Sequence, residues 1–340
     1  MPVSSLRNRL AMHPEAARLA RLAKRRARSI AARLPQRRRA VQPRPDADVL
    51  VAGWFSWPNC SATVGDVLAA DVVCRWLDDA GRIYDVARSG PLLDGVDFLR
   101  VDPARYRDVV FVCGPMHSQT TIDELLDRFP ASRHLAVDVS MIEPLAAWNP
   151  FDVVIERDSD RAARPDLAFA AHTAMVPLVG VSFVEPYPPE YPDRDLQGPA
   201  RAAVEDLVAA SDAAFVEIDT RLEERFRRPV DIETLSGRLD AMSTTRMHGL
   251  VLALKHRVPV VAVDPVLGGA KIMAQARTIG WPAAVTADEA TPERMGELYE
   301  FCLSEAGRAA ARAAALRANE LIEQARLEFL AALSAGRSGS

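Results

Sequence analysis

Cysteine is scarce in this chain, and long apolar runs are missing. The four cysteines stand far apart among 340 residues, at positions 60, 74, 113 and 302, and no two form a CxxC pair. That spacing argues against a disulfide framework and against a structural zinc site. No run approaches the roughly 18 apolar residues that a membrane span requires, and the first residues lack the apolar core of a secretory signal. We therefore expect a cytoplasmic protein without a metal site.

The charge of the chain is unevenly distributed. A length of 340 residues suffices for two domains with full cores, and 49% hydrophobic and 26% charged residues are typical of a soluble globular protein. Residues 1–40 hold twelve Lys or Arg and a single acid, Glu15, which is a charge of +11. Because the whole chain carries −4, residues 41–340 carry −15.

The basic arm at residues 1–40 has two interpretations. A basic segment on an acidic body is typical of a contact with a polyanion, and we predict a peripheral contact with anionic lipid at the inner face of the plasma membrane. The alternative is a solvated, partly helical extension without a specific partner. No recognised motif for specific nucleic-acid binding accompanies the charge. The Pro-containing stretch at residues 41–47 predicts a linker that ends the arm.

Beyond residue 47, short β-rich runs alternate with helical periods. Apolar residues between 64 and 77 recur at i, i+3 and i+4, and Gly81 is placed to end that helix. We expect strands at 49–55, 82–87, 109–114, 134–139, 151–156, 177–183, 213–218 and 259–264, and helices near 64–80, 120–129, 199–210, 246–256, 270–280 and 292–335. Strands rich in Val, Ile and Leu that alternate with helices indicate parallel sheets covered on both faces.

This pattern occurs twice and predicts two lobes. We assign residues 1–47 to the arm and linker, 48–176 to an N-terminal Rossmann-like lobe, and 177–335 to a C-terminal Rossmann-like lobe with a terminal helix. The fold class is therefore α/β, with two doubly wound lobes in tandem and a cleft between them, as in the GT-B architecture.

The residues most indicative of chemistry stand at 246–271. Arg246, His248 and Gly249 lie where a strand is expected to give way to a helix, whose N-terminus favours an anion. Arg246 offers bidentate binding of carboxylate or phosphate, and His248 can transfer a proton near neutral pH. Lys271, after a Gly-Gly pair, adds a second cation. A lone His is more often structural, but here three suitable residues coincide at the sheet edge where ligands of open α/β folds bind.

The same stretch carries a family resemblance. RMHG at 246–249, then an apolar helix, then VPVVAVDP at 258–265 and Lys271, resembles the C-terminal signature of the polysaccharide pyruvyl transferases. Three further stretches agree in order: WPNCSATVGD at 57–66, VVFVCG at 109–114 and VVIERDSD at 153–160. Together they span about residues 48–285.

The resemblance implies transfer of a pyruvyl group from phosphoenolpyruvate to hydroxyls of a cell-surface polysaccharide or its lipid-linked precursor. His248 would protonate the methylene carbon of the donor, while Arg157, Arg246 and Lys271 would hold its carboxylate and phosphate. Asp66 would bind an acceptor hydroxyl, with no cofactor beyond the donor substrate. Asn59, Gly65, Gly114 and Gly249 complete the predicted substrate-binding set.

Two of these assignments have structural alternatives. Asp66 stands at a loop-to-helix junction, where an Asp most often caps the helix, and Arg157 could instead form an ion pair with Asp158. Two other functions also stay open. One is a GT-B glycosyltransferase that uses a nucleotide-sugar, and the other is a non-catalytic relative that binds a glycan or an anionic surface.

Overall fold

The computed structural model describes residues 41–57, 62–88, 94–118, 122–184, 191–222 and 226–335. The basic arm at 1–40 lies outside these residues, so its predicted membrane contact stays a prediction. The chain divides into two compact units between Ala174 and Met175; the sequence placed this boundary after residue 176. No helix among the described residues has the length and apolar character needed to cross a membrane.

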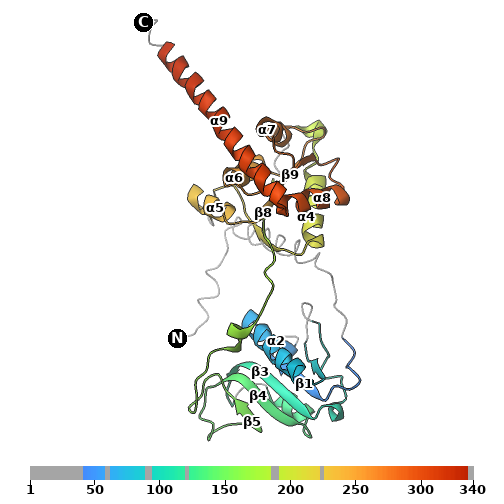
Figure 1. Ribbon diagram of the computed structural model, residues 1–340. Helices are drawn as coiled ribbons and strands as arrows, with labels where there is room; N and C mark the ends of the chain where they lie inside the picture. Colours follow the sequence, from blue (N-terminus) through green and yellow to red (C-terminus); the bar gives the residue numbers. More distant parts are fainter. Residues whose placement is uncertain are drawn as a thin grey trace, which may run out of the picture. The chain divides into compact units, whose positions relative to one another are not determined.

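The N-terminal lobe is built on a five-stranded parallel sheet. Its strands are β1 (Val49–Gly53), β2 (Tyr84–Val86), β3 (Asp108–Met116), β4 (Arg133–Met141) and β5 (Val153–Ile155), in the spatial order β2-β1-β3-β4-β5. Helices α2 (Val64–Asp79) and α3 (Asp123–Arg128) complete the lobe, and α2 lies across the sheet in Figure 1.

The strand β1 is buried on both faces of the sheet, and its successive residues point to opposite sides. Val49 and Val51 belong to the apolar cluster that includes α2, whereas Leu50 and Ala52 belong to the cluster that includes the α3 residue Leu125. This two-sided burial explains why β1 has a continuous apolar sequence rather than an alternating one.

The C-terminal lobe repeats the same plan. Its strands are β6 (Leu178–Ser182), β7 (Ala214–Glu217), β8 (Ala241–Thr244), β9 (Val260–Asp264) and β10 (Ala284–Thr286), all parallel, in the order β10-β9-β8-β6-β7. Its helices are α4 (Gln197–Ala210), α5 (Pro229–Ser236), α6 (Met247–Lys255), α7 (Lys271–Ile279), α8 (Pro292–Leu303) and α9 (Glu305–Ala335). The long helix expected at 292–335 is thus two helices, separated at Ser304.

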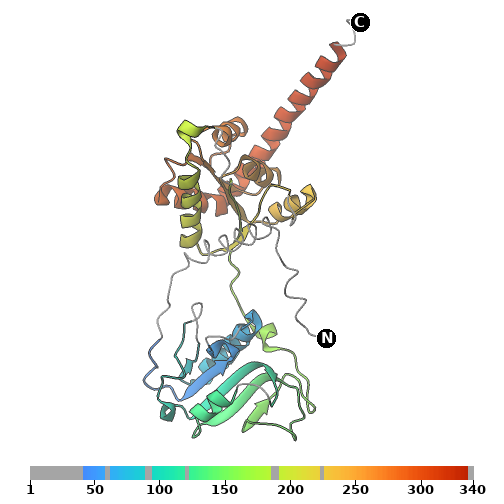
Figure 2. The ribbon, with the colours of Figure 1, turned by 180° about the vertical axis from the view of Figure 1, so that it is seen from behind.

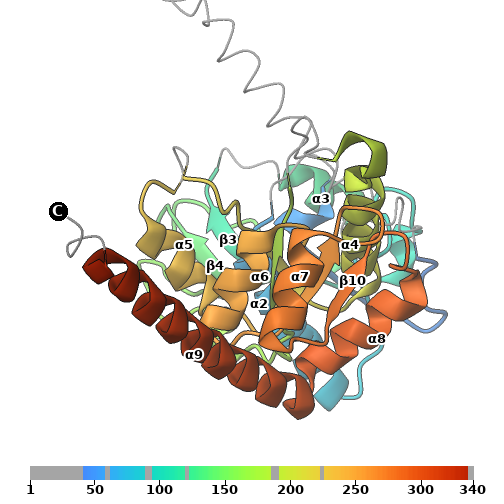
Figure 3. The same cartoon turned by 90° about the horizontal axis from the view of Figure 1, so that it is seen from above.

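Three helices of this lobe pack together. In Figure 3, α6 and α7 lie side by side and α9 crosses them, and α9 contacts both. The buried residues of α9 are all small, and they allow close approach: Gly307, Ala311, Ala314 and Ala315. The second half of α9 continues past the lobe as a single helix, as Figures 1 and 2 show.

The strand orders establish the fold class. Counted along the chain, each sheet has the order 2-1-3-4-5, a doubly wound arrangement in which ligands bind at the carboxyl edge, where the winding direction reverses. The two Rossmann-like α/β lobes predicted from the sequence are confirmed. The reversal lies between β1 and β3 in the N-terminal lobe, and between β6 and β8 in the C-terminal lobe.

Candidate functional site

The C-terminal lobe has a cavity of about 350 Å³ at the carboxyl edge of its sheet. Arg246, His248 and Lys271 all line it, so the three residues selected from the sequence meet in one pocket. Arg246 directly precedes α6, His248 lies in its first turn, and Lys271 begins α7. Because β8 and β9 are neighbouring parallel strands, the loops that follow them open at the same edge.

The start of α6 is held close to the end of β8. A Cβ atom added to Gly249 would lie 2.2 Å from Oγ1 of Thr244, which is too close for any side chain. The backbone N–H of Arg246 donates to this same Oγ1 at 3.0 Å. Gly249 is therefore needed for the packing of the helix on the strand, a more specific reason than the close backbone approach expected from the sequence.

Asp264, the last residue of β9, organises the neighbouring loop. It is 1% exposed, and its Oδ2 accepts hydrogen bonds from the N–H groups of Ala270 at 2.7 Å and Met273 at 3.0 Å. Gly268 and Gly269 both have positive φ and make the turn that returns the chain to α7. A carboxylate thus already stabilises the N-terminus of α7, whereas among the described residues no side chain caps α6. The N-terminus of α6 is consequently the better place for an external anion.

Arg246 is already paired in the absence of a ligand. Its Nη1 donates to Oδ1 of Asp219 at 2.9 Å, and the Arg246 side chain is 16% exposed. Asp219 follows β7 and is not among the residues predicted from the sequence. The rule that ligands meet at the carboxyl edge could have found it, because it stands just beyond a predicted strand.

A second segment forms another wall of the cavity. Tyr191, Asp195 and Gln197 line the pocket, and Asp195 forms a β-bridge with Val266. The N–H of Leu196 donates to the carbonyl of Pro265 at 2.8 Å. The pocket therefore combines cations with an aromatic ring and a carboxylate.

The N-terminal lobe has a different pocket, of about 440 Å³, at the corresponding edge of its sheet. Gly65, Asp66, Gly114 and Arg157 line it, so four residues named through the resemblance lie together. Asn59, the remaining predicted member, is outside the described residues.

Asp66 caps helix α2. Its Oδ2 accepts from the N–H of Thr63 at 2.7 Å and from Oγ1 of Thr63 at 2.9 Å, while the N–H of Asp66 donates back to Oγ1. This reciprocal capping box is the structural alternative considered for this residue. A role of Asp66 in binding the acceptor stays a prediction.

Arg157 is likewise paired with protein groups. It donates to Asp158 at 3.3 Å, to Asp166 at 2.6 Å and to Ser140 at 2.5 Å. The ion pair with Asp158 is the alternative that the sequence left open. With these partners, Arg157 holds the N-terminal pocket together, and binding a donor anion would require it to release a carboxylate.

Gly114 has a steric reason to be glycine. Its φ is 91°, and an added Cβ would lie 2.0 Å from Nε1 of Trp54. A side chain at Gly65 would meet only Thr63 Oγ1 at 3.5 Å, an ordinary contact. Of the two predicted loop glycines, Gly114 is thus structurally required and Gly65 is not.

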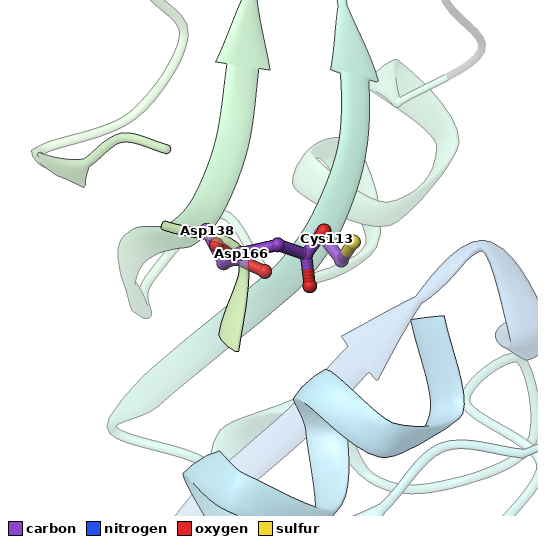
Figure 4. A group of neighbouring side chains, drawn as sticks. All are labelled: Cys113, Asp138 and Asp166. Atoms are coloured by element: carbon purple, nitrogen blue, oxygen red, sulfur yellow. The ribbon is translucent and has the colours of Figure 1, made fainter. Parts of the chain in front are cut away.

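An unpredicted group of potential metal ligands lies at the N-terminal pocket, which two of its three residues line. Cys113, Asp138 and Asp166 offer ligand atoms that lie within 4.8 Å of one another, and Figure 4 shows their side chains gathered near the adjacent strands β3 and β4. Burial raises the pKa of the Cys113 thiol to about 12, and burial also raises the pKa of Asp138. A thiol with so high a pKa is protonated near neutral pH and does not favour a cation, and Arg157 already pairs with Asp166.

No sequence signal could have found this group. Cys113 and Asp138 face each other across β3 and β4, where the register passes from Val112–Val137 to Gly114–Val139. Both have positive φ, 66° and 60°, which is rare for residues other than glycine. In the sequence, Cys113 and Asp138 each stand inside a segment that predicts an ordinary strand.

Comparisons with known proteins give only a remote likeness. No protein-family model matches the chain, and no curated protein matches it. Among solved structures it is similar to the spinosyn rhamnosyltransferase SpnG complexed with thymidine diphosphate, with a TM-score of 0.31 and 12% identity over 79% of this chain and 95% of that chain. It is also similar to the spinosyn forosaminyltransferase SpnP, with a TM-score of 0.30 and 13% identity over 85% and 100% of the two chains.

A third solved structure, the glycotransferase of kitacinnamycin, gives a TM-score of 0.30 and 12% identity over 83% of this chain and 99% of that one. At TM-scores this low the likeness carries no argument about function. The fold class rests on the strand orders of the two sheets.

Proposed function

We propose that this chain is a glycan-modifying transferase whose C-terminal lobe binds a phosphorylated donor. One observation carries the proposal: Arg246, His248 and Lys271, from the loops and helices that follow two neighbouring strands, line one cavity beside the uncapped N-terminus of α6. Guanidinium, ammonium and helix N–H groups are the usual partners of phosphate in proteins.

Phosphoenolpyruvate is the donor that the motifs favour. His248 would give a proton to its methylene carbon, and an acceptor hydroxyl would attack the adjacent carbon. Phosphate then leaves, and a second hydroxyl of the acceptor closes the ketal. Arg246 and Lys271 would balance the negative charge of the carboxylate and the departing phosphate.

A nucleotide-sugar is the second candidate donor, and the shape of the pocket favours it. Tyr191, Val184 and Pro265 add apolar and aromatic surface that the small, highly polar phosphoenolpyruvate does not need. An aromatic ring can stack on a base, and Asp195 offers a carboxylate for ribose hydroxyls.

Thermal unfolding of the full chain with each donor tests the proposal. A ligand present at about 100 times its dissociation constant stabilises the folded state by about 2.7 kcal/mol. We expect a rise in the unfolding midpoint with phosphoenolpyruvate or with a nucleoside diphosphate, and loss of that rise in Arg246→Ala. Arg228→Ala is the matched control, because Arg228 pairs with Asp231 on the surface and does not line the cavity.

The donor that produces the shift decides between the two candidates. A shift with phosphoenolpyruvate alone supports pyruvyl transfer, and a shift with the nucleoside diphosphate alone supports glycosyl transfer. A folded wild type that responds to neither at millimolar concentration contradicts the proposal and favours a non-catalytic relative.

A further inference from the structure

Asp219 and Arg246 form an ion pair although they follow strands that are not neighbours in the sheet. Asp219 follows β7 and Arg246 follows β8, and β6 lies between these two strands in the sheet. The carboxylate therefore extends across the end of β6, at the point where the winding direction reverses. An ion pair at this position connects the two halves of the sheet at the edge where the pocket opens.

Both oxygens of Asp219 are held. Oδ1 accepts from Nη1 of Arg246 at 2.9 Å and from the backbone N–H of Arg221 at 2.9 Å. Oδ2 accepts from Nη2 of Arg221 at 3.0 Å and from its Nε at 3.3 Å. Arg221 thus fixes the carboxylate from one side, and the carboxylate fixes Arg246 on the other.

This arrangement leaves donors of Arg246 available. Among the described residues, Nη1 of the Arg246 guanidinium donates a hydrogen bond to Asp219, whereas Nε and Nη2 of Arg246 donate none. Arg246 also lines the cavity. A guanidinium that is held by one nitrogen can still offer the others to a carboxylate or phosphate.

The charge of Asp219 is shared between two guanidinium groups, since it accepts hydrogen bonds from both Arg221 and Arg246. Two cations, Arg246 and Lys271, and two carboxylates, Asp195 and Asp264, line the cavity itself, and Asp264 accepts hydrogen bonds from backbone N–H groups at the start of α7. Burial alone would raise the pKa of Asp219, but the hydrogen bonds and charge of Arg221, with the charge of Arg246, lower it overall. Asp219 is therefore ionised at neutral pH.

We infer that Asp219 is a positioning residue, which orders the guanidinium of Arg246 for the anionic group of the donor before the donor binds. The inference rests on the proposed function. Ordering a long side chain in advance removes part of the conformational cost of binding. The inference predicts that removal of the Asp219 carboxylate weakens anion binding. The opposite result is expected for a residue that only adds negative charge near the pocket, because its removal would strengthen anion binding.

Calorimetric titration of the full chain with inorganic phosphate and with phosphoenolpyruvate provides the test. We expect Asp219→Ala to weaken binding of at least one anion by about tenfold or more, although it removes a negative charge. Asp219→Glu, which retains the carboxylate, should recover part of the affinity. Asp231→Ala is the matched control, because Asp231 also pairs with an Arg of this lobe but lies outside the cavity.

A double-mutant cycle separates positioning from a general structural effect. The loss caused by Asp219→Ala should disappear when Arg246 is already Ala, because there is then no guanidinium to position. Where Asp219→Ala does not fold, Asp219→Asn replaces it in the same cycle. Equal or tighter anion binding by a folded Asp219 variant, or additive losses in the cycle, overturns the inference.

The two proposals fail in different ways. A wild type that binds phosphate, but neither phosphoenolpyruvate nor a nucleoside diphosphate, contradicts the proposed donor. The role of Asp219 is then decided by the double-mutant cycle, with phosphate as the ligand. A wild type that binds none of these anions overturns both.

Discussion

The two lobes share one strand order but present different side chains at the same edge. In the C-terminal lobe, Arg246, His248 and Lys271 surround the cavity where the winding direction reverses. In the N-terminal lobe the corresponding pocket has Asp66 and Asp166 around Arg157. The topology determines where a pocket forms, and the residues in the loops determine its charge.

The lobes also differ in how their polar groups are satisfied. In the N-terminal pocket the charged groups are bound to neighbouring protein groups, since Arg157 pairs with Asp158 and Asp166, and Asp66 caps α2. The C-terminal pocket is lined by two cations, Arg246 and Lys271, and two carboxylates, Asp195 and Asp264, and among the described residues no side chain caps the N-terminus of α6. This difference favours the C-terminal lobe as the site for a phosphorylated donor.

The largest effect is expected at Gly114 in the N-terminal lobe. Gly114→Ala combines a positive φ with a contact of 2.0 Å to Trp54, and we expect it to lower the free energy of unfolding by about 2–4 kcal/mol. Gly65→Ala is the control, with a change within about 0.5 kcal/mol. Chemical denaturation monitored by tryptophan fluorescence measures the free energy of unfolding of this lobe, because four of the five tryptophans lie in it. Equal stability of the two variants would show that Trp54 can move away.

A smaller loss is expected for Gly249→Ala in the C-terminal lobe. This glycine has no positive φ, so only the clash with Thr244 acts against a side chain, and we expect a loss of about 1–3 kcal/mol. Hydrogen exchange read peptide by peptide should show faster exchange in α6 and β8, with α2 and β3 unchanged. Equal acceleration in both lobes would show that the lobes unfold as one unit, and would remove the basis for treating them separately.

The third expected effect depends on pH and lies in the N-terminal lobe. Glu156 is 1% exposed, and hydrogen bonds from Arg161 lower its pKa from 4.5 to about 2. A lowered pKa means that the ionised form stabilises the folded state, so this stability is present above pH 4.5 and is lost as the pH falls towards 2. We expect Glu156→Gln to cost about 2 kcal/mol at pH 7 and progressively less on acidification. Urea denaturation at pH 7, 4 and 3 measures the difference, and a cost that does not depend on pH would contradict it.

Much of the fold could be predicted from the sequence, and the exceptions have a common cause. The strands at 109–114 and 259–264 are long apolar runs, and the structure has β3 and β9 there. The strand β10 and the helix α5 were not predicted, and β8 was expected before Arg246 but without bounds. The two strands have only four and three residues, and Ser243, Thr244 and Thr286 make them resemble loops, although all three side chains are buried. Such segments become strands because their neighbours β6 and β9 supply hydrogen-bond partners.

The sequence by itself determined the alternation of strands and helices, the two lobes, and the meeting of Arg246, His248 and Lys271. These follow from local patterns and from the rule that parallel strands open their loops at one edge. Only the tertiary structure decided that Asp219 holds Arg246, that Trp54 makes Gly114 necessary, and that Cys113 and Asp138 are neighbours. These contacts join residues 25 to 60 positions apart through side-chain directions and backbone angles, and no local pattern of amino acids encodes such distances.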